Sequence, residues 1–205
     1  MRTRGRPKSD QKRRQIIGAA VKHFLTGGYG ATSLDAIAKT AGVSKQTIYS
    51  HFEGKLALLE ECIQDRCREG ILADELLDFN EPPEQFLHSF AARFINTLCG
   101  SGPINLWRLC AAECERNTEI GEVYFNSGPR IVMDAVAQYL TLANERGELM
   151  VSEPKLAAAQ FLFMVKGLPV DTQMLNLKQW PYSFSAQEYT KASVELFLNA
   201  HRVSG

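Results

Sequence analysis

No apolar run in the 205-residue sequence approaches the roughly 18 residues that a membrane span requires. The basic start, MRTRGRPKSDQKRR, lacks the uninterrupted apolar core and the small-residue cleavage site of a secretory signal peptide. The five cysteines are an odd number without the compact spacing of a disulfide framework. These absences predict a cytoplasmic protein with no membrane partner.

The common catalytic motifs are absent as well. The sequence contains no Gly-rich phosphate loop, no Gly-x-Ser-x-Gly and no His-Glu-x-x-His. Its four histidines show no base–nucleophile spacing, and His88 is the only candidate metal ligand in the segment before Cys110 and Cys114. We therefore expect no enzyme, no metal site and no cofactor.

The charge that is present is segregated, although the net charge of the whole chain is zero. Residues 1–55 hold eleven Lys and Arg against three Asp and Glu, a net charge of +8, so that residues 56–205 carry −8. A basic segment of this kind is the electrostatic footprint of a protein that contacts a polyanion. We expect a basic domain over 1–55 and an acidic domain over 56–205.

Helical periodicity dominates the sequence and predicts an all-α fold of about nine helices. Ile16, Ala20 and Phe24 share one helical face, and Gly27-Gly28 ends that helix. A second helix is expected from Ser33 to about Thr40. The segment VDTQMLNLKQWPYSF is expected to be a longer connection between the last two helices.

Two short helices joined through Ala-Gly-Val predict a helix-turn-helix, with Ser44 capping the second of them. Its apolar stripe takes Ile48 and Phe52. The side chains left outside are short and polar, as reading of the major groove requires: Lys45, Gln46, Thr47, Ser50 and His51. Lys45 and Lys55 lie at electropositive helix starts, where a bound phosphate would turn an unfavourable position into a favourable one.

The stretch Ile16–Leu59, above all GYGATSLDAIAKTAGVSKQTIYSHFEGKLALL, strongly resembles the N-terminal domain of TetR-type transcriptional repressors. The resemblance implies a three-helix DNA-binding domain whose third helix lies in the major groove of an operator. By position, bases are then approached by Lys45, Gln46, Thr47 and Ser50, and phosphates by Tyr49, His51 and Lys55. Ser33 and Ser44 would cap the two helices and offer backbone amides to the DNA strand, and the arm RTRGRPK would reach the minor groove or flanking phosphates.

Several of these residues also have readings without DNA. Tyr49 is half in the apolar stripe, and packing explains it as well as a phosphate contact does. His51 could be a capping or surface histidine. Thr32 and Ser33 would start a helix in any protein. Gln46 has no packing role, so it is the strongest candidate for sequence reading.

The acidic domain resembles, less closely, the C-terminal domain of the AefR-like branch of the same family. The family implies that it binds a small-molecule effector and forms a homodimer through its last two helices. Two segments are apolar on most sides and support a four-helix interface: Ala157, Ala158, Phe161, Phe163 and Val165, then Ala192, Val194, Leu196, Phe197 and Leu198.

A ligand pocket is expected among aromatic and sulfur-bearing residues: Phe90, Phe94, Trp107, Cys110, Cys114, Phe125 and Met164. Residues of these types at helical spacing are also common in cores. Few buried charges are evident, which favours an apolar or aromatic ligand. Cys110 and Cys114 share a helix face and could pack, sense redox conditions or bind metal.

The leading hypothesis is therefore a homodimeric repressor released from a palindromic operator by a small ligand. A transcriptional activator or a thiol-redox regulator on the same scaffold is the alternative. A non-specific architectural DNA protein would explain the basic arm but not the large acidic domain.

Overall fold

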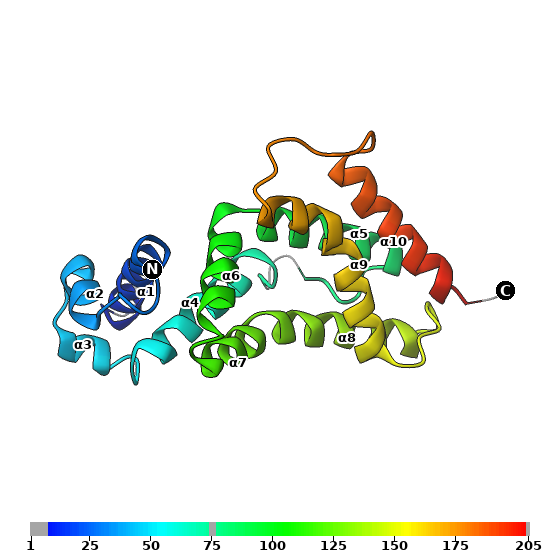
Figure 1. Ribbon diagram of the computed structural model, residues 1–205. Helices are drawn as coiled ribbons and strands as arrows, with labels where there is room; N and C mark the ends of the chain where they lie inside the picture. The colour runs from blue at the N-terminus through cyan, green and yellow to red at the C-terminus, as the bar shows by residue number, and fades with distance from the viewer. Residues whose placement is uncertain (1–7, 74–76, 204–205) are drawn as a thin grey trace, which may run out of the picture. The chain divides into compact units, whose positions relative to one another are not determined.

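The computed structural model describes residues 8–73 and 77–203, and within these ranges the chain forms ten α-helices (Figure 1). The expected all-α fold is confirmed. The helices are α1 (Lys8–Gly27), α2 (Leu34–Ala41), α3 (Lys45–Tyr49), α4 (Lys55–Gly70), α5 (Pro83–Leu98), α6 (Ser101–Glu113), α7 (Thr118–Ser127), α8 (Pro129–Glu145), α9 (Pro154–Met174) and α10 (Ala186–His201).

The sequence patterns did not predict α7 as a separate helix. Its start is marked by Asn117, whose side-chain oxygen accepts a hydrogen bond from the backbone N–H of Glu119 at 3.2 Å. Gly121 inside the helix weakens the sequence signal, because glycine disfavours helix interiors. The basic arm 1–7 lies outside the described residues.

The chain divides into two compact units, which do not follow the expected boundary at residue 55. The first unit contains the described residues up to Asp65 together with Asn105–Ser127. The second contains the described residues of Arg66–Ile104 and those from Gly128 onwards. Part of the segment assigned to the acidic domain thus belongs to the same unit as the helix-turn-helix.

The core of the first unit is built on α1. Ile16, Ala20 and Phe24 are fully buried there, as their four-residue spacing predicts. They belong to one cluster with Ile37 of α2 and Ile48 of α3, and that cluster extends to α4, α6 and α7. The helix-turn-helix therefore rests on a continuous apolar base.

The core of the second unit is rich in aromatic rings. Phe86 of α5 stacks on Tyr139 of α8 with ring centroids 3.6 Å apart, and Phe86, Phe90 and Phe94 follow one another along α5. The rings are buried, and contacts of this kind dominate core energetics. Phe79, from the connection before α5, packs edge-on against the same stack.

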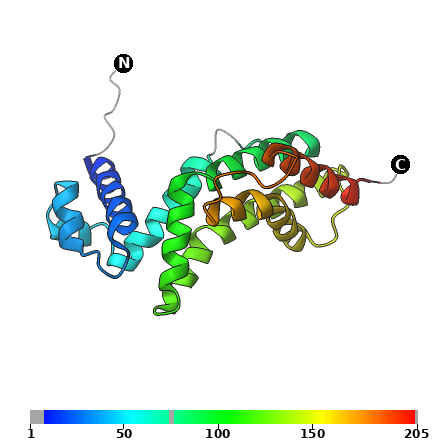
Figure 2. The same ribbon diagram turned by 45° about the horizontal axis from the view of Figure 1, so that its top comes forward.

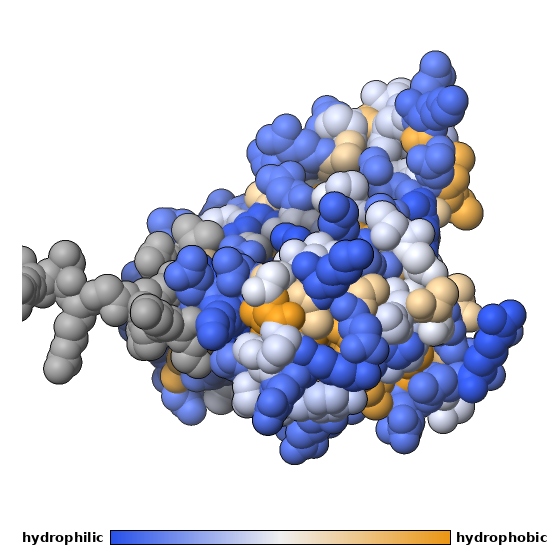
Figure 3. Space-filling view, turned by 90° about the vertical axis from the view of Figure 1, so that its left-hand side faces the viewer, coloured by the Kyte–Doolittle hydropathy of each residue, from blue (hydrophilic) through white to orange (hydrophobic). Residues whose placement is uncertain are grey.

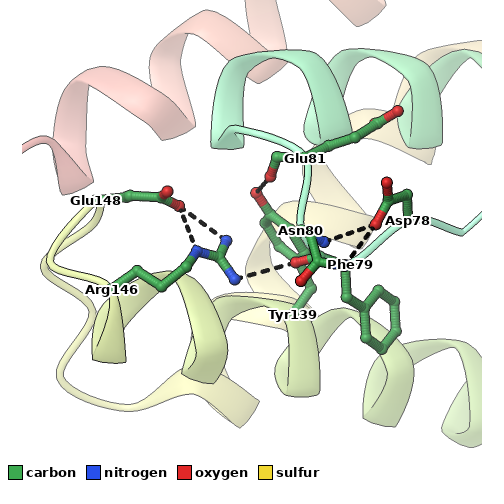
Figure 4. A network of polar contacts seen from close by, with 7 residues as sticks. All are labelled: Asp78, Phe79, Asn80, Glu81, Tyr139, Arg146 and Glu148. Atoms are coloured by element: carbon green, nitrogen blue, oxygen red, sulfur yellow. Dashed lines mark hydrogen bonds and ion pairs between the residues drawn. The ribbon is translucent and has the colours of Figure 1, made fainter.

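Polar contacts fix that connection to α8 (Figure 4). The Tyr139 hydroxyl donates to the carbonyl oxygen of Glu81 at 2.8 Å. Arg146, which follows α8, donates to the carbonyl oxygen of Phe79 at 3.0 Å and to the Glu148 carboxylate at 2.8 Å. The segment is therefore held by its backbone at the end of the aromatic stack.

The connection between α9 and α10 runs over residues 175–185 and is shorter at its start than expected, because α9 continues through Pro169 to Met174 (Figure 2). α10 begins with a capping box in which Ser185 and Glu188 exchange hydrogen bonds. Among the described residues, none of the helices has the length and apolar character needed to cross a bilayer.

Candidate nucleic-acid interface

The polar side chains that the sequence places outside the apolar stripe are only partly exposed: Lys45, Gln46 and Ser50 face solvent, whereas Thr47 and His51 are half-buried. Ile48 is fully buried, whereas Gln46 and Ser50 are exposed and Tyr49 is 53% exposed. Tyr49 thus contributes little to the core, which weakens the packing interpretation. On the face of the molecule that Figure 3 shows, hydrophilic residues predominate, with smaller hydrophobic patches among them.

Two serines and one glycine set the geometry of the helix-turn-helix. The Ser33 hydroxyl accepts a hydrogen bond from the Ala36 N–H at 3.2 Å at the start of α2, and the Ser44 hydroxyl accepts one from the Thr47 N–H at 3.1 Å at the start of α3. Gly42 ends α2 with φ of 66°, a left-handed conformation that favours glycine. The capping roles expected from the sequence are confirmed.

Lys45 is not a free cation. Its ammonium group lies 2.8 Å from the Asp35 carboxylate, and both side chains are exposed at the surface. This hydrogen bond and the negative charge of Asp35 raise the pKa of Lys45. Lys45 must therefore give up its bond to the Asp35 carboxylate before it contacts a phosphate or a base. The sequence analysis did not predict the ion pair between Asp35 and Lys45. The signal for it was an acid in the preceding helix of the same helix-turn-helix.

Lys55 points inward rather than to solvent. Its ammonium group donates to the carbonyl oxygens of Tyr29 at 2.7 Å, Thr32 at 3.0 Å and Gly30 at 3.3 Å. It also lies 4.4 Å from the centre of the Tyr29 ring. An ammonium group has three N–H donors, and here three carbonyl oxygens receive them. The predicted phosphate contact of Lys55 would require these bonds to break.

Thr32 is buried and its hydroxyl is also turned inward. The oxygen lies 2.6 Å from the carbonyl oxygen of Gly28 and 3.1 Å from that of His23. Thr32 and Lys55 thus both bind the backbone of the turn that leads from α1 into α2. His51 is half-buried beside Phe52, with ring centroids 6.1 Å apart.

The same turn is contacted from α6, which sequence reasoning did not foresee. The Gly30 N–H donates to the carboxylate of Glu113 at 3.4 Å. A side chain at Gly28 or Gly30 would approach that carboxylate, and Gly28 has φ of 80°. Burial, with the charges of Glu119 and Glu113, raises the pKa of the Tyr29 phenol. The turn thus lies between a cation on its carbonyl side and an anion on its amide side.

The seven expected ligand-lining residues do not form one group. Phe90, Phe94 and Met164 belong to the second unit, where both phenylalanines are buried in the ring stack. The others belong to the first unit: Trp107, Cys110, Cys114 and Phe125. Cys110 is buried in the same cluster as the helix-turn-helix, and about half of the Phe125 surface, 49%, is exposed. Periodicity assigns a residue to a helix face but does not tell which core that face joins.

Two of the cysteines, Cys110 and Cys67, are buried and half-buried thiols, respectively. Burial raises the pKa of Cys110 to about 12 and that of Cys67 to about 11, so both stay protonated at neutral pH. The Cys114 thiol donates to the carbonyl oxygen of Ala111 at 3.1 Å. In the described part of the chain, no group of three His, Cys, Asp or Glu side chains is arranged to bind a metal ion.

Comparisons with known proteins identify two matching family descriptions. Residues 16–62 match the bacterial regulatory proteins of the tetR family, and residues 85–203 match the C-terminal domain of AefR-like transcriptional repressors. The second match alone covers more than half of the chain. The first match includes the sequence of α3, and the second includes the sequences of α9 and α10.

Curated relatives and solved structures agree with these matches. The transcriptional regulator UidR of Escherichia coli K12 is 30% identical over 141 residues, 67% of this chain and 68% of UidR. SrpR of Pseudomonas putida, also a transcriptional regulator, is 38% identical over 58 residues, 28% of this chain and 27% of SrpR. The match to SrpR spans about a quarter of that relative's length, and the match to another curated relative about two-fifths. The structure of FrrA, named a flavonoid-responsive regulator, is 30% identical with a TM-score of 0.77, and the match covers 96% of this chain and all of FrrA.

Proposed function

The chain belongs to the TetR family of transcriptional regulators, and from that premise we propose that it is a homodimeric repressor released from a palindromic operator by a small ligand. The observation that carries the proposal is α3. It is capped, anchored through Ile48, and turns Gln46, Tyr49 and Ser50 outward. This is the arrangement by which a recognition helix enters the major groove.

The residues of the helix-turn-helix then have distinct roles at the operator. Gln46, Thr47 and Ser50 read base edges, and Gln46 has the side chain suited to adenine. Tyr49 and His51 contact phosphates, as do the backbone amides near Ser33 and Ser44. Lys45 contacts a phosphate as well, after its ammonium group has left the Asp35 carboxylate. Thr32 and Lys55 hold the preceding turn in place.

The proposed second copy packs against α9 and α10. Regulators of this family act as dimers, and this chain leaves large apolar side chains exposed on both helices. Phe163 is 60% exposed, Leu156 58% and Leu196 63%. Exposed apolar residues that line up along two adjacent helices are typical of an interface. A two-fold pair would place two α3 helices on two half-sites.

We propose an apolar or aromatic ligand for the second unit. Its core contains Phe90 and Phe94 in a ring stack, with Met164 packed against the same cluster. The name of the relative FrrA, a flavonoid-responsive regulator, fits an aromatic ligand of this class. Trp107, Cys110, Cys114 and Phe125 stay a separate set of candidates in the first unit.

Release then follows from population shift. Two half-sites are read together only when the two α3 helices keep the right spacing. A ligand that binds more tightly to a dimer with another spacing lowers operator occupancy by its differential affinity for the two states. The proposal needs no catalytic step and no cofactor. It places the protein in the cytoplasm, as expected for a protein whose partner is DNA.

Selection from a random duplex pool at near-physiological salt tests the proposal. A recovered palindrome with two half-sites, followed by loss of binding upon addition of a flavonoid or another planar aromatic compound, would support it. Transcription in vitro from the recovered site distinguishes repression from activation. Binding without any enriched motif, lost as salt rises, would contradict sequence-specific regulation.

A further inference from the structure

The connection between α9 and α10 carries a cluster of aromatic rings that the proposed function does not use. Trp180, Tyr182, Phe184 and Tyr189 contact one another in series. Tyr182 and Phe184 are stacked, with ring centroids 5.1 Å apart and an angle of 9° between the rings. Tyr182 is 53% exposed and Phe184 is also exposed. Connections are usually polar, so stacked rings in solvent call for a covering surface.

The cluster joins the exposed stripe of α9 at a defined point. Phe163 is exposed on α9, and Gly167 follows it one turn later. The Tyr189 hydroxyl donates to the Met164 carbonyl oxygen at 3.0 Å, and a Cβ atom added at Gly167 would lie 3.2 Å from that hydroxyl. The lack of a side chain at Gly167 is what lets the ring cluster reach α9.

The cluster also continues the exposed stripe of α10. Tyr189, Ala192, Leu196 and Ala200 are spaced by three, four and four residues, so they share one helical face. Ala192, Leu196 and Ala200 are exposed along it. Tyr189 therefore contacts α9 and also begins the exposed stripe of α10, and the rings of Phe184 and Tyr182 continue from it into the connection.

We propose that this ring cluster is a clasp that packs against a second copy of the chain and extends the α9–α10 interface. The inference depends on the dimer of the proposed function and adds the connection 180–184 to it. The argument for a second copy, rather than another occupant, is continuity. Exposed apolar side chains lie on α9 and on α10, Tyr189 of α10 contacts α9 at Met164, and its ring continues into those of Phe184 and Tyr182, so a surface that covers both helices also reaches the rings.

The experiment measures the dimer dissociation constant by sedimentation of labelled full-length protein. Tyr182→Ser with Phe184→Ser is expected to weaken the dimer at least tenfold, since aromatic anchors dominate interface energies. The matched control is Leu175→Ser with Leu177→Ser, which removes exposed apolar residues from the same connection outside the ring cluster. A dissociation constant within twofold of the parent value, or equal weakening by both pairs, would overturn the clasp.

Leu196→Glu separates this inference from the dimer itself. If Leu196→Glu dissociates the protein while the ring variant does not, the clasp falls and the α9–α10 interface stands. If Leu196→Glu leaves the dimer intact, the proposed interface falls, and the clasp with it. Should the ring variant lose binding of an aromatic effector while its dimer constant stays unchanged, the rings serve a ligand and the clasp is refuted.

Footprinting with hydroxyl radicals supplies a readout that does not depend on folding of the ring variant. In the clasp, Tyr182 and Phe184 of the parent dimer are oxidised several-fold more slowly than in monomeric Leu196→Glu protein. Tyr49, on α3 and exposed, serves as the internal reference. Equal oxidation rates of the two rings in dimer and monomer would count against the clasp.

Discussion

The ammonium group of Lys55 lies 2.7 Å from the carbonyl oxygen of Tyr29, twenty-six residues earlier in the chain. With the carbonyl oxygens of Thr32 and Gly30 it completes a three-acceptor site at the start of α4. A positive charge at a helix N-terminus is unfavourable by itself. Here the three carbonyl oxygens turn the negative ends of their dipoles to the Lys55 ammonium group. The positive charge therefore stabilises the turn that precedes the helix-turn-helix.

Replacing Lys55 with methionine keeps the length of the side chain and removes these hydrogen bonds. We expect the free energy of unfolding to fall by about 1–3 kcal/mol, because partly buried carbonyl oxygens lose their donor. Urea titration measures this change, with the exposed Lys22→Met as control. The salt dependence of binding to random DNA should stay the same in folded protein. A slope reduced by one would instead place the ammonium group on a phosphate.

Asp35 restrains Lys45, and removing the acid should release the lysine. Asp35→Asn is expected to strengthen binding to any duplex several-fold and to steepen the salt dependence, because Lys45 then meets phosphate without losing a partner. Glu53→Gln, at another exposed acid of the same region, controls for the change in net charge. Equal gains in the two variants, measured by fluorescence anisotropy at several salt concentrations, would mean that net charge alone matters.

Gln46 should contribute to specificity rather than to general affinity. Gln46→Ala is expected to cost about 1–3 kcal/mol on the selected operator and nothing on random DNA, with the salt slope unchanged. Tyr49→Phe is the contrasting variant, since loss of a phosphate-facing hydroxyl should weaken both kinds of DNA alike. Competition binding with the two duplexes gives both numbers. If Gln46→Ala also weakened binding to random DNA, Gln46 would not be a residue that reads base sequence.

Gly70 packs so closely against α5 that even one methyl group should be harmful. A Cβ atom there would lie 2.5 Å from Cγ2 of Thr97. We expect Gly70→Ala to lower the melting temperature although alanine favours helices. Thr97→Ala in the same chain should recover most of the loss. If the double variant is no more stable than Gly70→Ala, the cause lies elsewhere.

Burial should keep two thiols unreactive. With pKa values of about 11 and about 12, Cys67 and Cys110 are ionised to roughly one part in a thousand or less at pH 8. Alkylation by iodoacetamide, followed by mass spectrometry, should therefore modify these two cysteines very slowly in the folded protein and rapidly in urea. Fast modification of Cys110 in folded protein would revive the redox-regulator alternative.

Local structure was predictable where one residue type settles it. Ser33 and Ser44 cap helices and Gly42 makes the turn, because each has a short-range partner in the sequence. The exposed face of α3 followed from the spacing of Ile48 and Phe52. The TetR-type resemblance supplied the assignment of roles, and the family matches confirm the family itself.

Long-range pairing was not predictable from periodicity. Nothing local indicates that Lys55 reaches back to Tyr29, or that Glu113 of α6 contacts Gly30. The same reason explains the divided ligand candidates. Cys110 is correctly inward on its helix, but the core it joins is that of the helix-turn-helix rather than the ring stack of Phe90.

The exposed stripe of α9 and α10 also affects how such a regulator responds to its own abundance. In the proposed dimer a single copy carries one α3, whereas a palindrome requires two. At concentrations below the dimer dissociation constant, operator occupancy therefore rises with the square of the amount of chain. A small change in synthesis or proteolysis would then be amplified at the promoter. Interface side chains such as Leu196 would thus set the protein concentration at which the operator becomes occupied, although they contact no base pair.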